Sequence, residues 1–535
     1  MLYNNFMNIL NTKINKEHLV TVLFYLLLFL LSAALAVTSR NYDNDLWARL
    51  IAGMSVVQTG QILKYDFLSF TPTHPWYDHE WGSSVIFYLV QSNFGHIGLL
   101  TLQVIMIFLT MLFLVKTVKV RCENICNYKN ILIYFIVLNS FMVTYSSLIR
   151  CHSFSFLFFI FELYILEKIR KTQNNKLFFI FPFLFLIWGN MHGGVFSGLG
   201  LLVLYAIGEC LNKKQFKYYI MSSLAGFLVL FINPYGIEYV KFLIKAITMK
   251  RPDVVEWWCI FHKHNYKEFM QFKFLALFYI ILEFFKCKKI GFNYNSIDKT
   301  KFLVLIVTLS FAIAHVKMMP FFALSSTVFC YEDIYSMFKK YNMPKHGIKI
   351  INIVLTLYAV LMLTLKNYSP MVNFEIYPIM EIEFLKANHI TGKIVTNFGI
   401  GSYTAYKLYP QNKIYMDGRY EEVYNPDLLY DLKKFYMIAV GYDSILKKYN
   451  PDIILMEKNY RAYNYMKDNK NWIMVFDGLK YGVFIKPEKY RKNFVSPNGN
   501  LKYYQKTVFN TDIKFKGENF IDINKINRKK LNNAK

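Results

Sequence analysis

The sequence predicts a polytopic α-helical membrane protein with a small α/β domain at its C-terminus. Of its 535 residues, 55% are hydrophobic and only 18% are charged, which is less charge than a soluble protein of this length carries. Hydrophobic runs of lipid-spanning length recur between short polar connectors as far as about residue 366. Beyond that point, short apolar runs alternate with charged, Gly, Pro and Asn residues. The pattern therefore predicts two domains, a membrane domain at 1–366 and an α/β domain at 367–535.

About eleven segments are predicted to be transmembrane helices. The first, at 18–37, has no Asp, Glu, Lys or Arg between His18 and Ala36 and is too long for the core of a signal peptide, so we expect a retained helix. A shorter run at 84–93 is expected to be an interfacial or partly inserted helix. The other predicted spans lie at 97–115, 131–149, 152–166, 177–190, 193–209, 218–232, 270–285, 302–316, 318–331 and 349–366.

Lys and Arg are concentrated in every second connector, which sets the predicted orientation. Because cytoplasmic connectors of membrane proteins collect these residues, the N-terminus and the basic connectors are predicted to be cytoplasmic. The same rule explains much of the net charge of +27, so the charge does not indicate a nucleic-acid partner. The first outer loop at 38–96, the connector at 233–269 and the C-terminal domain are then predicted to be extracytoplasmic. The basic connectors lie near 116–129, 168–176, 213–217, 286–299 and 339–349.

The first outer loop carries two acidic clusters on either side of a predicted amphipathic segment at 46–58. Asp43 and Asp45 follow the first span in a D-x-D pattern, and Asp78 and Glu80 lie in "PWYDHEWG" near the end of the loop. A carboxylate with a raised pKa can act as a general base, and paired carboxylates can hold a divalent cation. In the alternative interpretation, Asp43 caps a helix and the later two acids are solvated.

A second group of candidates consists of ionisable side chains in the later outer connectors. Charged groups at membrane depth are costly unless they pair or face a water-filled cavity, so they are functional candidates. Cations there could bind the charge that develops on a phosphate leaving group. Alternatively, Arg150 and Lys317 reach toward lipid headgroups and His192 is a hydrogen-bonded packing residue. These substrate-binding candidates are Arg150, His192, Arg251, Glu256, His315 and Lys317.

Several short motifs follow one another along most of the chain. They are "DNDLWARLIAGMSVVQTGQI", "YDFLSFT", "PWYDHEWG", "IWGNMHGG", "INPYG", "VVEWW", "HVKMMPFF" and "IYMDGRYEEVY". In this order they resemble the GT-C superfamily of integral-membrane glycosyltransferases, in particular bacterial mannosyltransferases and aminoarabinose transferases that use polyprenyl-phosphate sugars. One departure is "DLWARL", where family members often have a His after a Trp pair.

This resemblance implies a glycosyltransferase that moves a hexose or pentose from a polyprenyl-phosphate donor to an extracytoplasmic glycan, lipid or protein acceptor. It implies that Asp45 is the leading catalytic carboxylate and Asp43 the second, with Asp78 and Glu80 as partner acids. His79 lies between these partners and is a substrate-binding candidate. The resemblance allows one cofactor, a divalent metal ion on Asp43 and Asp45. The implied location, among membrane lipids, is the inner (plasma) membrane of a bacterium.

The C-terminal domain is predicted to be a small α/β fold with a partly parallel sheet. Its segment at 392–424 follows a strand, turn, helix, strand pattern, and a hairpin is expected to turn at Asp477-Gly478. "FGIGSY" at 398–403 lacks the spacing of a dinucleotide site. "DGR" at 417–419 follows a predicted strand end, where it either contacts a ligand or forms a structural Asp–Arg pair.

Two other classes of function remain open from the sequence. A transporter or flippase of lipid-linked material would place acids within broken helices and show inverted repeats, whereas the acids here are concentrated in loops. A non-catalytic membrane scaffold would present the C-terminal domain without chemistry. The transferase hypothesis expects the acids after the first span and the cations of the later connectors to meet in one cavity at the outer lipid boundary.

Overall fold

The chain folds into two compact units. The computed structural model describes residues 16–38, 43–122 and 149–494, except for residues 253, 266, 290, 292 and 341–349 and scattered positions between 351 and 375. The first unit contains 1–40, 100–236 and 247–367, and the second contains 41–99, 237–246 and 368–535. The first outer loop therefore belongs to the same compact unit as the C-terminal domain. The unit boundary at 367/368 lies beside the domain boundary expected from the sequence.

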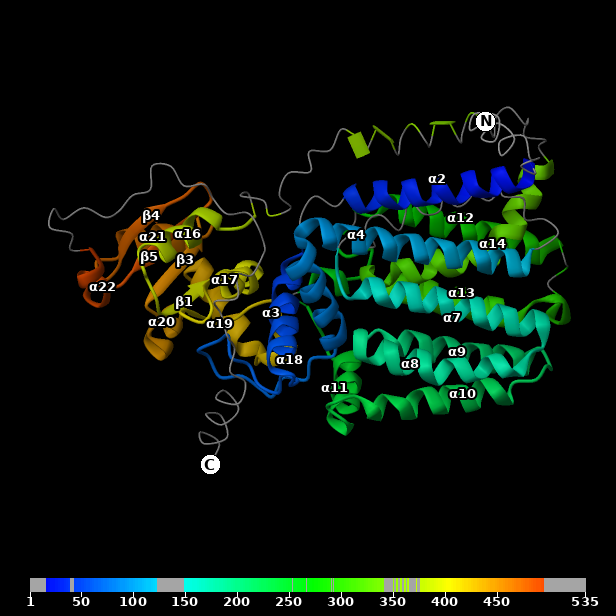
Figure 1. Ribbon diagram of the computed structural model, residues 1–535, viewed down its shortest axis with the longest axis horizontal. Coiled ribbons are helices and arrows are strands. Elements are labelled where there is room, and N and C mark those ends of the chain that lie inside the picture. Colours follow the sequence, from blue (N-terminus) through cyan, green and yellow to red (C-terminus); the bar gives the residue numbers. More distant parts are fainter. Residues whose placement is uncertain are drawn as a thin grey trace, which may run out of the picture. The chain divides into compact units, whose positions relative to one another are not determined.

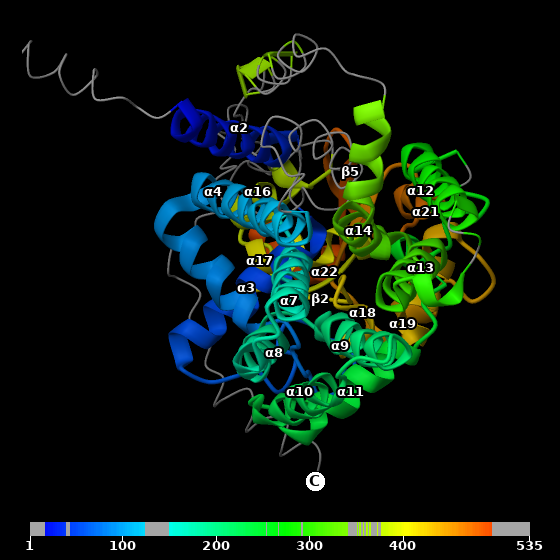
Figure 2. The ribbon, with the colours of Figure 1, turned by 90° about the vertical axis from the view of Figure 1, so that its right-hand side faces the viewer.

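The first unit is a bundle of helices. Figure 1 shows α7, α8, α9, α10 and α13 running side by side, and Figure 2 shows the same helices from their ends. Glycine permits one close approach, because a Cβ on Gly208 would lie only 2.4 Å from Thr300 Oγ1 on the neighbouring helix. The helices are α2 (Lys16–Thr38), the later part of α4 (Trp81–Arg121), α7 (His152–Thr172), α8 (Ile180–Met191), α9 (Val195–Leu211), α10 (Lys217–Leu228), α12 (Met270–Lys289), α13 (Lys299–Ala314) and α14 (Met319–Lys340).

Short 3-10 turns extend or join these helices. The turns are η1 (Asn175–Phe179), η2 (Val229–Ile232), η3 (Val255–Trp257), η4 (Tyr294–Ser296) and η5 (Val316–Met318). Helix α13 begins at a side-chain cap, because Asp298 accepts hydrogen bonds from the backbone N–H groups of Thr300 and Lys301. Helix α7 ends where Gln173 adopts a left-handed conformation with φ of 55°.

Helices occupy nine of the predicted spans, at 18–37, 97–115, 152–166, 177–190, 193–209, 218–232, 270–285, 302–316 and 318–331. By length and composition, one described helix, α4, can cross a membrane. A second span results if Lys217–Ile232 and Ile237–Thr248 are taken together. The total of eleven spans stays a prediction, because most other helices are too short or too polar for that test. The predicted spans at 131–149 and 349–366 lie largely outside the described residues.

The second unit contains a five-stranded mixed sheet in the order β2-β1-β3-β5-β4. Strand β1 (Lys393–Thr396) pairs in parallel with β2 (Lys413–Ile414) and β3 (Ile453–Glu457). Strands β4 (Ile473–Asp477) and β5 (Tyr481–Ile485) form an antiparallel hairpin, and β5 also pairs with β3. The predicted partly parallel sheet and the turn at Asp477-Gly478 are therefore both present.

Helices surround this sheet in the second unit. Asn425 caps α19 by accepting a hydrogen bond from the Asp427 N–H, with Pro426 at the first helical position. The helices are α3 (Asn44–Thr59), α11 (Ile237–Thr248, up to residue 246), α16 (Ile379–Ala387), η6 (Phe398–Ile400), α17 (Gly401–Leu408), α18 (Tyr420–Val423), α19 (Pro426–Met437), α20 (Ser444–Tyr449), α21 (Arg461–Asp468) and α22 (Pro487–Phe494).

The first outer loop extends the core of this domain. Its segment around Ser69 forms a parallel bridge with Ile414 of β2, where Phe70 N–H donates to the Ile414 carbonyl at 3.0 Å. Helix α3 packs on α17 through Trp47, whose ring centroid is 4.9 Å from that of Tyr403. The run at 84–93 is helical, as the first part of α4, which kinks at Gly95. These contacts fix α3 and the end of the loop in one rigid framework.

Candidate active site

Arg49 is the centre of a buried ion cluster in the second unit. The guanidinium group lies 2.5 Å from Asp78 Oδ1, 3.3 Å from Glu80 Oε2 and 3.1 Å from Glu422 Oε2. The Arg49 residue is only 3% exposed, and Asp78 is 1% exposed. A buried guanidinium with three carboxylates is held in place from several directions, and its removal would leave these acids without a compensating charge. The loop acid Asp78 is therefore paired and buried, contrary to its interpretation as a solvated residue.

Asp43 and Asp45 lie at the start of α3, one turn before Arg49. Asp43 caps the helix, because its carboxylate accepts a hydrogen bond from the Asp45 N–H at 2.9 Å. Asp45 and Arg49 are four residues apart and so share one face of α3. Asp45 also approaches the "DGR" turn, since a Cβ on Gly418 would lie 3.0 Å from Asp45 Oδ1. A glycine at 418 thus leaves space beside the predicted catalytic carboxylate.

Three side chains at this cluster could hold a metal ion. Ligand atoms of His79, Glu80 and Glu422 lie within 4.8 Å of one another, and oxygen and imidazole donors suit a divalent cation. The carboxylates of Asp78, Glu80 and Glu422 carry three negative charges against one positive charge on Arg49, which leaves −2. A divalent cation would balance that charge. The trio differs from the D-x-D pair predicted to bind a metal.

Glu422 differs from an ordinary surface glutamate. Burial raises the pKa of its carboxyl group, while the nearby Arg49 and His79 lower the pKa and Glu80 and Asp78 raise it. Trp76 Nε1 donates a hydrogen bond to Glu422 Oε2 at 3.1 Å. Glu422 is thus held on two sides, by the Trp76 indole and by the Arg49 guanidinium.

A second buried ion cluster supports the first. Arg419 Nε donates to both oxygens of Asp417, at 2.9 and 3.1 Å, and its Nη1 donates to Asp66 at 2.6 Å. The Arg419 guanidinium lies 4.7 Å from the Trp76 ring centroid, which places this indole between the two arginine clusters. The "DGR" segment therefore forms a structural Asp–Arg pair. Its effect on the site is to orient Trp76, and through Trp76 the Glu422 carboxylate.

In the first unit, cationic side chains gather around Trp257. Lys317 Nζ lies 3.3 Å from the Trp257 ring centroid, and the Arg251 guanidinium carbon lies 4.2 Å from it. The His315 ring is 5.2 Å away, and its Nδ1 is 2.8 Å from the Trp257 carbonyl oxygen. A backbone hydrogen bond from Val316 to Trp258 joins the two segments. Three predicted substrate-binding residues are therefore brought together, from connectors that are distant in the sequence.

The remaining candidates of the first unit are also paired. Arg150 forms an ion pair with Glu256, the residue next to Trp257. His192 Nδ1 accepts a hydrogen bond from the Gly194 N–H at 3.1 Å and lies 2.7 Å from Ser155 Oγ. Because Nδ1 is an acceptor, a neutral His192 carries its proton on Nε2. His192 is thus hydrogen-bonded within the bundle, as the packing interpretation expected, and its ring is fixed in one tautomer.

Comparison with known proteins identifies the fold. No protein-family model and no curated protein matches the sequence. Solved structures of the Archaeoglobus fulgidus oligosaccharyltransferase do match. Its apo form gives a TM-score of 0.53 at 9% identity, covering 81% of this chain and 69% of that chain. The complex of this enzyme, AglB, with an inhibitory peptide and a dolichol-phosphate gives 0.55 at 9% identity over the same shares. A form tethered to an acceptor peptide with the NVT sequon gives 0.52 at 10% identity, over 80% and 68%.

AglB is a glycosyltransferase of the GT-C superfamily. The chain has the GT-C fold. The expected resemblance is therefore confirmed at the level of fold. At 9 to 10% identity the match assigns no residue roles, so the catalytic and binding roles of the individual side chains stay predictions. The expected meeting of the loop acids with the cations of the later connectors also stays a prediction.

Two residues of the ion cluster in the second unit were not among the candidates predicted from the sequence. Glu422 lies in the quoted motif "IYMDGRYEEVY", but its partner Arg49 is 373 positions away. Arg49 itself replaced an expected His and was noted only as a departure. The available signal was an arginine within the mostly apolar segment at 46–58, because a charged residue needs partners when its helix is buried.

Proposed function

We propose that this chain is a membrane glycosyltransferase that moves a sugar from a polyprenyl-phosphate donor to an extracytoplasmic glycan, lipid or protein. The supporting observation is the buried acidic cluster beside α3 in a chain with the GT-C fold. A cluster of carboxylates with a residual charge of −2 costs free energy to bury, so it is expected where chemistry or a metal ion requires it. A scaffold that only presents a domain would not need such a cluster.

A location in a bacterial inner membrane is part of the proposal. Large apolar side chains are exposed on the helices of the first unit, among them Phe183 at 70%, Leu224 at 60% and Phe284 at 54%. Water disfavours such surfaces, whereas lipid accepts them. The alternating basic connectors then give a cytoplasmic N-terminus and an extracytoplasmic second unit.

In the proposed reaction, Asp45 acts as the general base. It takes a proton from the acceptor, whose hydroxyl oxygen or amide nitrogen forms the new bond to the anomeric carbon of the sugar. The bond from that carbon to the donor phosphate oxygen breaks. The polyprenyl phosphate leaves with the electron pair and an additional negative charge. Asp43 supports this role by fixing the start of α3, since it caps the backbone at Asp45.

The cations around Trp257 are proposed to bind the donor phosphate. The flat indole face holds Lys317 and Arg251 by cation–π contacts, which orient both groups without neutralising their charge. Arg150 adds a third positive charge, partly offset by Glu256. His315 and His192 can donate hydrogen bonds to phosphate or sugar oxygens. Such oriented cations stabilise a phosphate as it leaves.

A divalent metal ion is a proposed cofactor. The residues that would hold it are His79, Glu80 and Glu422, because their donor atoms converge and the local charge is −2 before an ion binds. When bound, the ion would supply Lewis-acid stabilisation of negative charge. In this arrangement Asp78 pairs with Arg49 and keeps the guanidinium group directed at the cluster.

Substitution of Asp45 by Asn tests the proposal. Membranes containing each variant are incubated with short-chain polyprenyl-phosphate mannose or glucose, and released polyprenyl phosphate is measured by mass spectrometry. We expect Asp45→Asn to reduce release by at least about a hundredfold, the usual contribution of a general base. Asp427→Asn is the matched control, because Asp427 is an exposed acid of the same unit. Normal release from Asp45→Asn would exclude Asp45 as base, and lipid movement without release would favour a flippase.

A further inference from the structure

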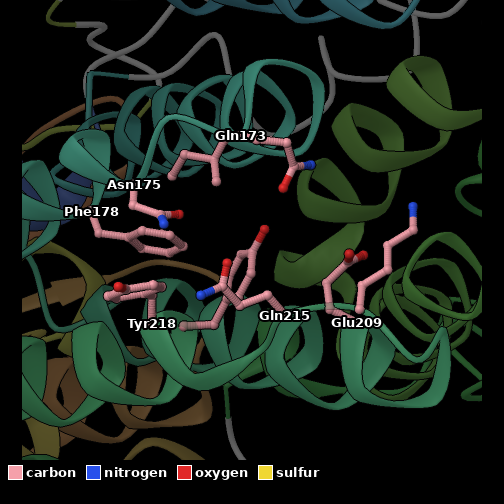
Figure 3. A pocket seen from close by; sticks show the side chains of 9 residues that line it. Gln173, Asn175, Phe178, Glu209, Gln215 and Tyr218 are labelled. Atoms are coloured by element: carbon pink, nitrogen blue, oxygen red, sulfur yellow. The ribbon is translucent and has the colours of Figure 1, made fainter.

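A polar cavity lies between helix ends of the first unit, far from the proposed phosphate-binding cations. Its volume is about 300 Å³, and Figure 3 shows Gln173, Asn175 and Phe178 on one side and Glu209, Gln215 and Tyr218 on the other. The cavity adjoins the end of α7, whereas Arg150 precedes its start. A 21-residue helix at 1.5 Å per residue separates them by roughly 30 Å. The cavity is therefore a separate site.

One wall of the cavity is a rigidly held carboxylate. Glu209 is 3% exposed, and its Oε1 atom forms an ion pair with Arg170 Nε at 2.9 Å and accepts a hydrogen bond from Thr300 Oγ1 at 2.7 Å. Both of these partners bind the same oxygen. Within the described part of the chain, Glu209 Oε2 makes no hydrogen bond, and Glu209 lines the cavity. A fixed carboxylate with one oxygen left over is suited to accept hydrogen bonds from a ligand.

The other walls combine amides with aromatic rings. Gln173, Asn175 and Gln215 each supply a donor and an acceptor group. The Phe178 and Tyr218 rings stack at 5.6 Å with an angle of 25°, and Tyr219 meets Phe178 edge-on at 4.8 Å. Aromatic faces carry partial negative charge and attract polarised C–H groups. A sugar ring requires both features, because its hydroxyl groups need hydrogen-bonding partners and its C–H groups pack on a flat aromatic face.

The charges favour a neutral ligand. Arg170 pairs with Glu209, Glu167 and Asp298, and Arg121 also pairs with Glu167, so two guanidinium groups balance most of the charge of three carboxylates. Glu209 therefore attracts an ammonium group only weakly. Lys214 is the single cation in the lining and is exposed, which is too little to select a phosphate. The volume lies at the lower limit of small-molecule sites, about 300 Å³, and suits one ring better than an oligosaccharide.

We propose that this cavity is a second carbohydrate site, which binds a single neutral sugar ring. Glu209 Oε2 and the three amides bind the hydroxyl groups, and the aromatic rings contact the apolar face of the sugar. Its lining comes from the ends and connectors of α7, α9 and α10, which the basic-connector rule predicts to be cytoplasmic. The site thus lies on the side opposite to that predicted for transfer, and it does not depend on the proposed catalytic residues.

The test uses the full-length protein in nanodiscs, because maltoside detergents carry glucose units that would compete. Binding of methyl α-mannopyranoside, methyl β-glucopyranoside and N-acetylglucosamine is measured by saturation-transfer NMR and calorimetry, with phosphocholine as the charged alternative. We expect at least one sugar to bind and the double variant Gln215→Ala/Tyr218→Ala to weaken binding about tenfold or more. Lys213→Ala is the control, because this residue is in the same connector but does not line the cavity.

The outcomes separate this proposal from the transferase. Asp45→Asn should leave sugar binding unchanged even if it abolishes transfer. The second site is disproved if none of the three sugars binds, if Gln215→Ala/Tyr218→Ala binds as well as the parent protein, or if phosphocholine binds in their place. Thermal unfolding of each variant shows whether the fold is retained, since Gln215 and Tyr218 are exposed and carry little of the core.

Discussion

Replacement of Arg49 by Met provides a direct measure of the buried ion cluster. The substitution keeps most of the side-chain volume and removes one cation from three carboxylates. Two unit charges 4 Å apart interact by about 4 kcal/mol at an effective dielectric constant of 20, but desolvation of the guanidinium offsets much of this. Removal of one partner of a buried pair costs about 3–5 kcal/mol. That is a large part of the 5–15 kcal/mol that stabilises a typical domain.

The assay is pulse proteolysis in urea at pH 5 and pH 8. Without Arg49, the carboxylates can avoid mutual repulsion only by binding protons, so the loss of stability should be larger at pH 8 than at pH 5. The double variant Arg49→Met/Glu422→Gln should recover part of the loss, because it removes one unpaired charge. Arg461→Ala is the control for an exposed arginine of the same unit. A loss below about 1 kcal/mol, typical of a surface pair, or a loss independent of pH, would refute this reasoning.

Two further predictions concern the second unit. Burial raises the pKa of Glu381 to about 7, so the folded state favours the protonated carboxyl group. The stability that this protonated group contributes is fully present below about pH 4.5 and is lost as the pH rises through 7. In urea unfolding measured across this pH range, Glu381→Gln should make the loss of unfolding free energy with rising pH smaller, by up to about 3 kcal/mol. An unchanged loss would show that Glu381 is not the group responsible. Addition of Mn²⁺ should stabilise the purified protein and raise its melting temperature. At a Mn²⁺ concentration a hundredfold above Kd, the free energy of unfolding should increase by about 2.7 kcal/mol. Glu422→Gln should abolish this shift and Asp43→Asn should not; the reverse pattern would assign the ion to the D-x-D pair.

The helices and the sheet were predictable because their signals are local. Apolar runs such as 18–37 and 193–209 can satisfy their backbone only as helices in an apolar environment, and both are helical. Asp477-Gly478 marks the end of β4, and the hairpin turns directly after Asp477, through residues 478–480. The number of membrane spans is harder to predict from the sequence. It depends on where each helix ends and on how polar its ends are, and a hydropathy average over a sequence window does not resolve either.

The ion pairs of the site were not predictable, because they join residues that are distant in the chain. The sequence identified Asp78 and Glu80 as acids of interest, but nothing local indicated that Arg49 or Glu422 would face them. The inclusion of the first loop in the α/β unit follows from backbone pairing at Ile414, on a strand of only two residues. The cations around Trp257 converge for a similar reason, since backbone hydrogen bonds join Ile260 to Ile313 at the end of α13 and Val316 to Trp258.

The two units have opposite charges at their candidate residues, which bears on the choice between transferase and scaffold. The cluster at Arg49 carries three carboxylates and one guanidinium, a net charge of −2. Among the described residues, the group at Trp257 brings together the cations Arg150, Arg251 and Lys317, with Glu256 paired to Arg150. Sugar transfer from a lipid phosphate needs both kinds of environment, since one step removes a proton from the acceptor and the other releases an anion. A scaffold that only presents a domain needs neither environment. The presence of both environments in one chain therefore favours the proposed transferase over the scaffold.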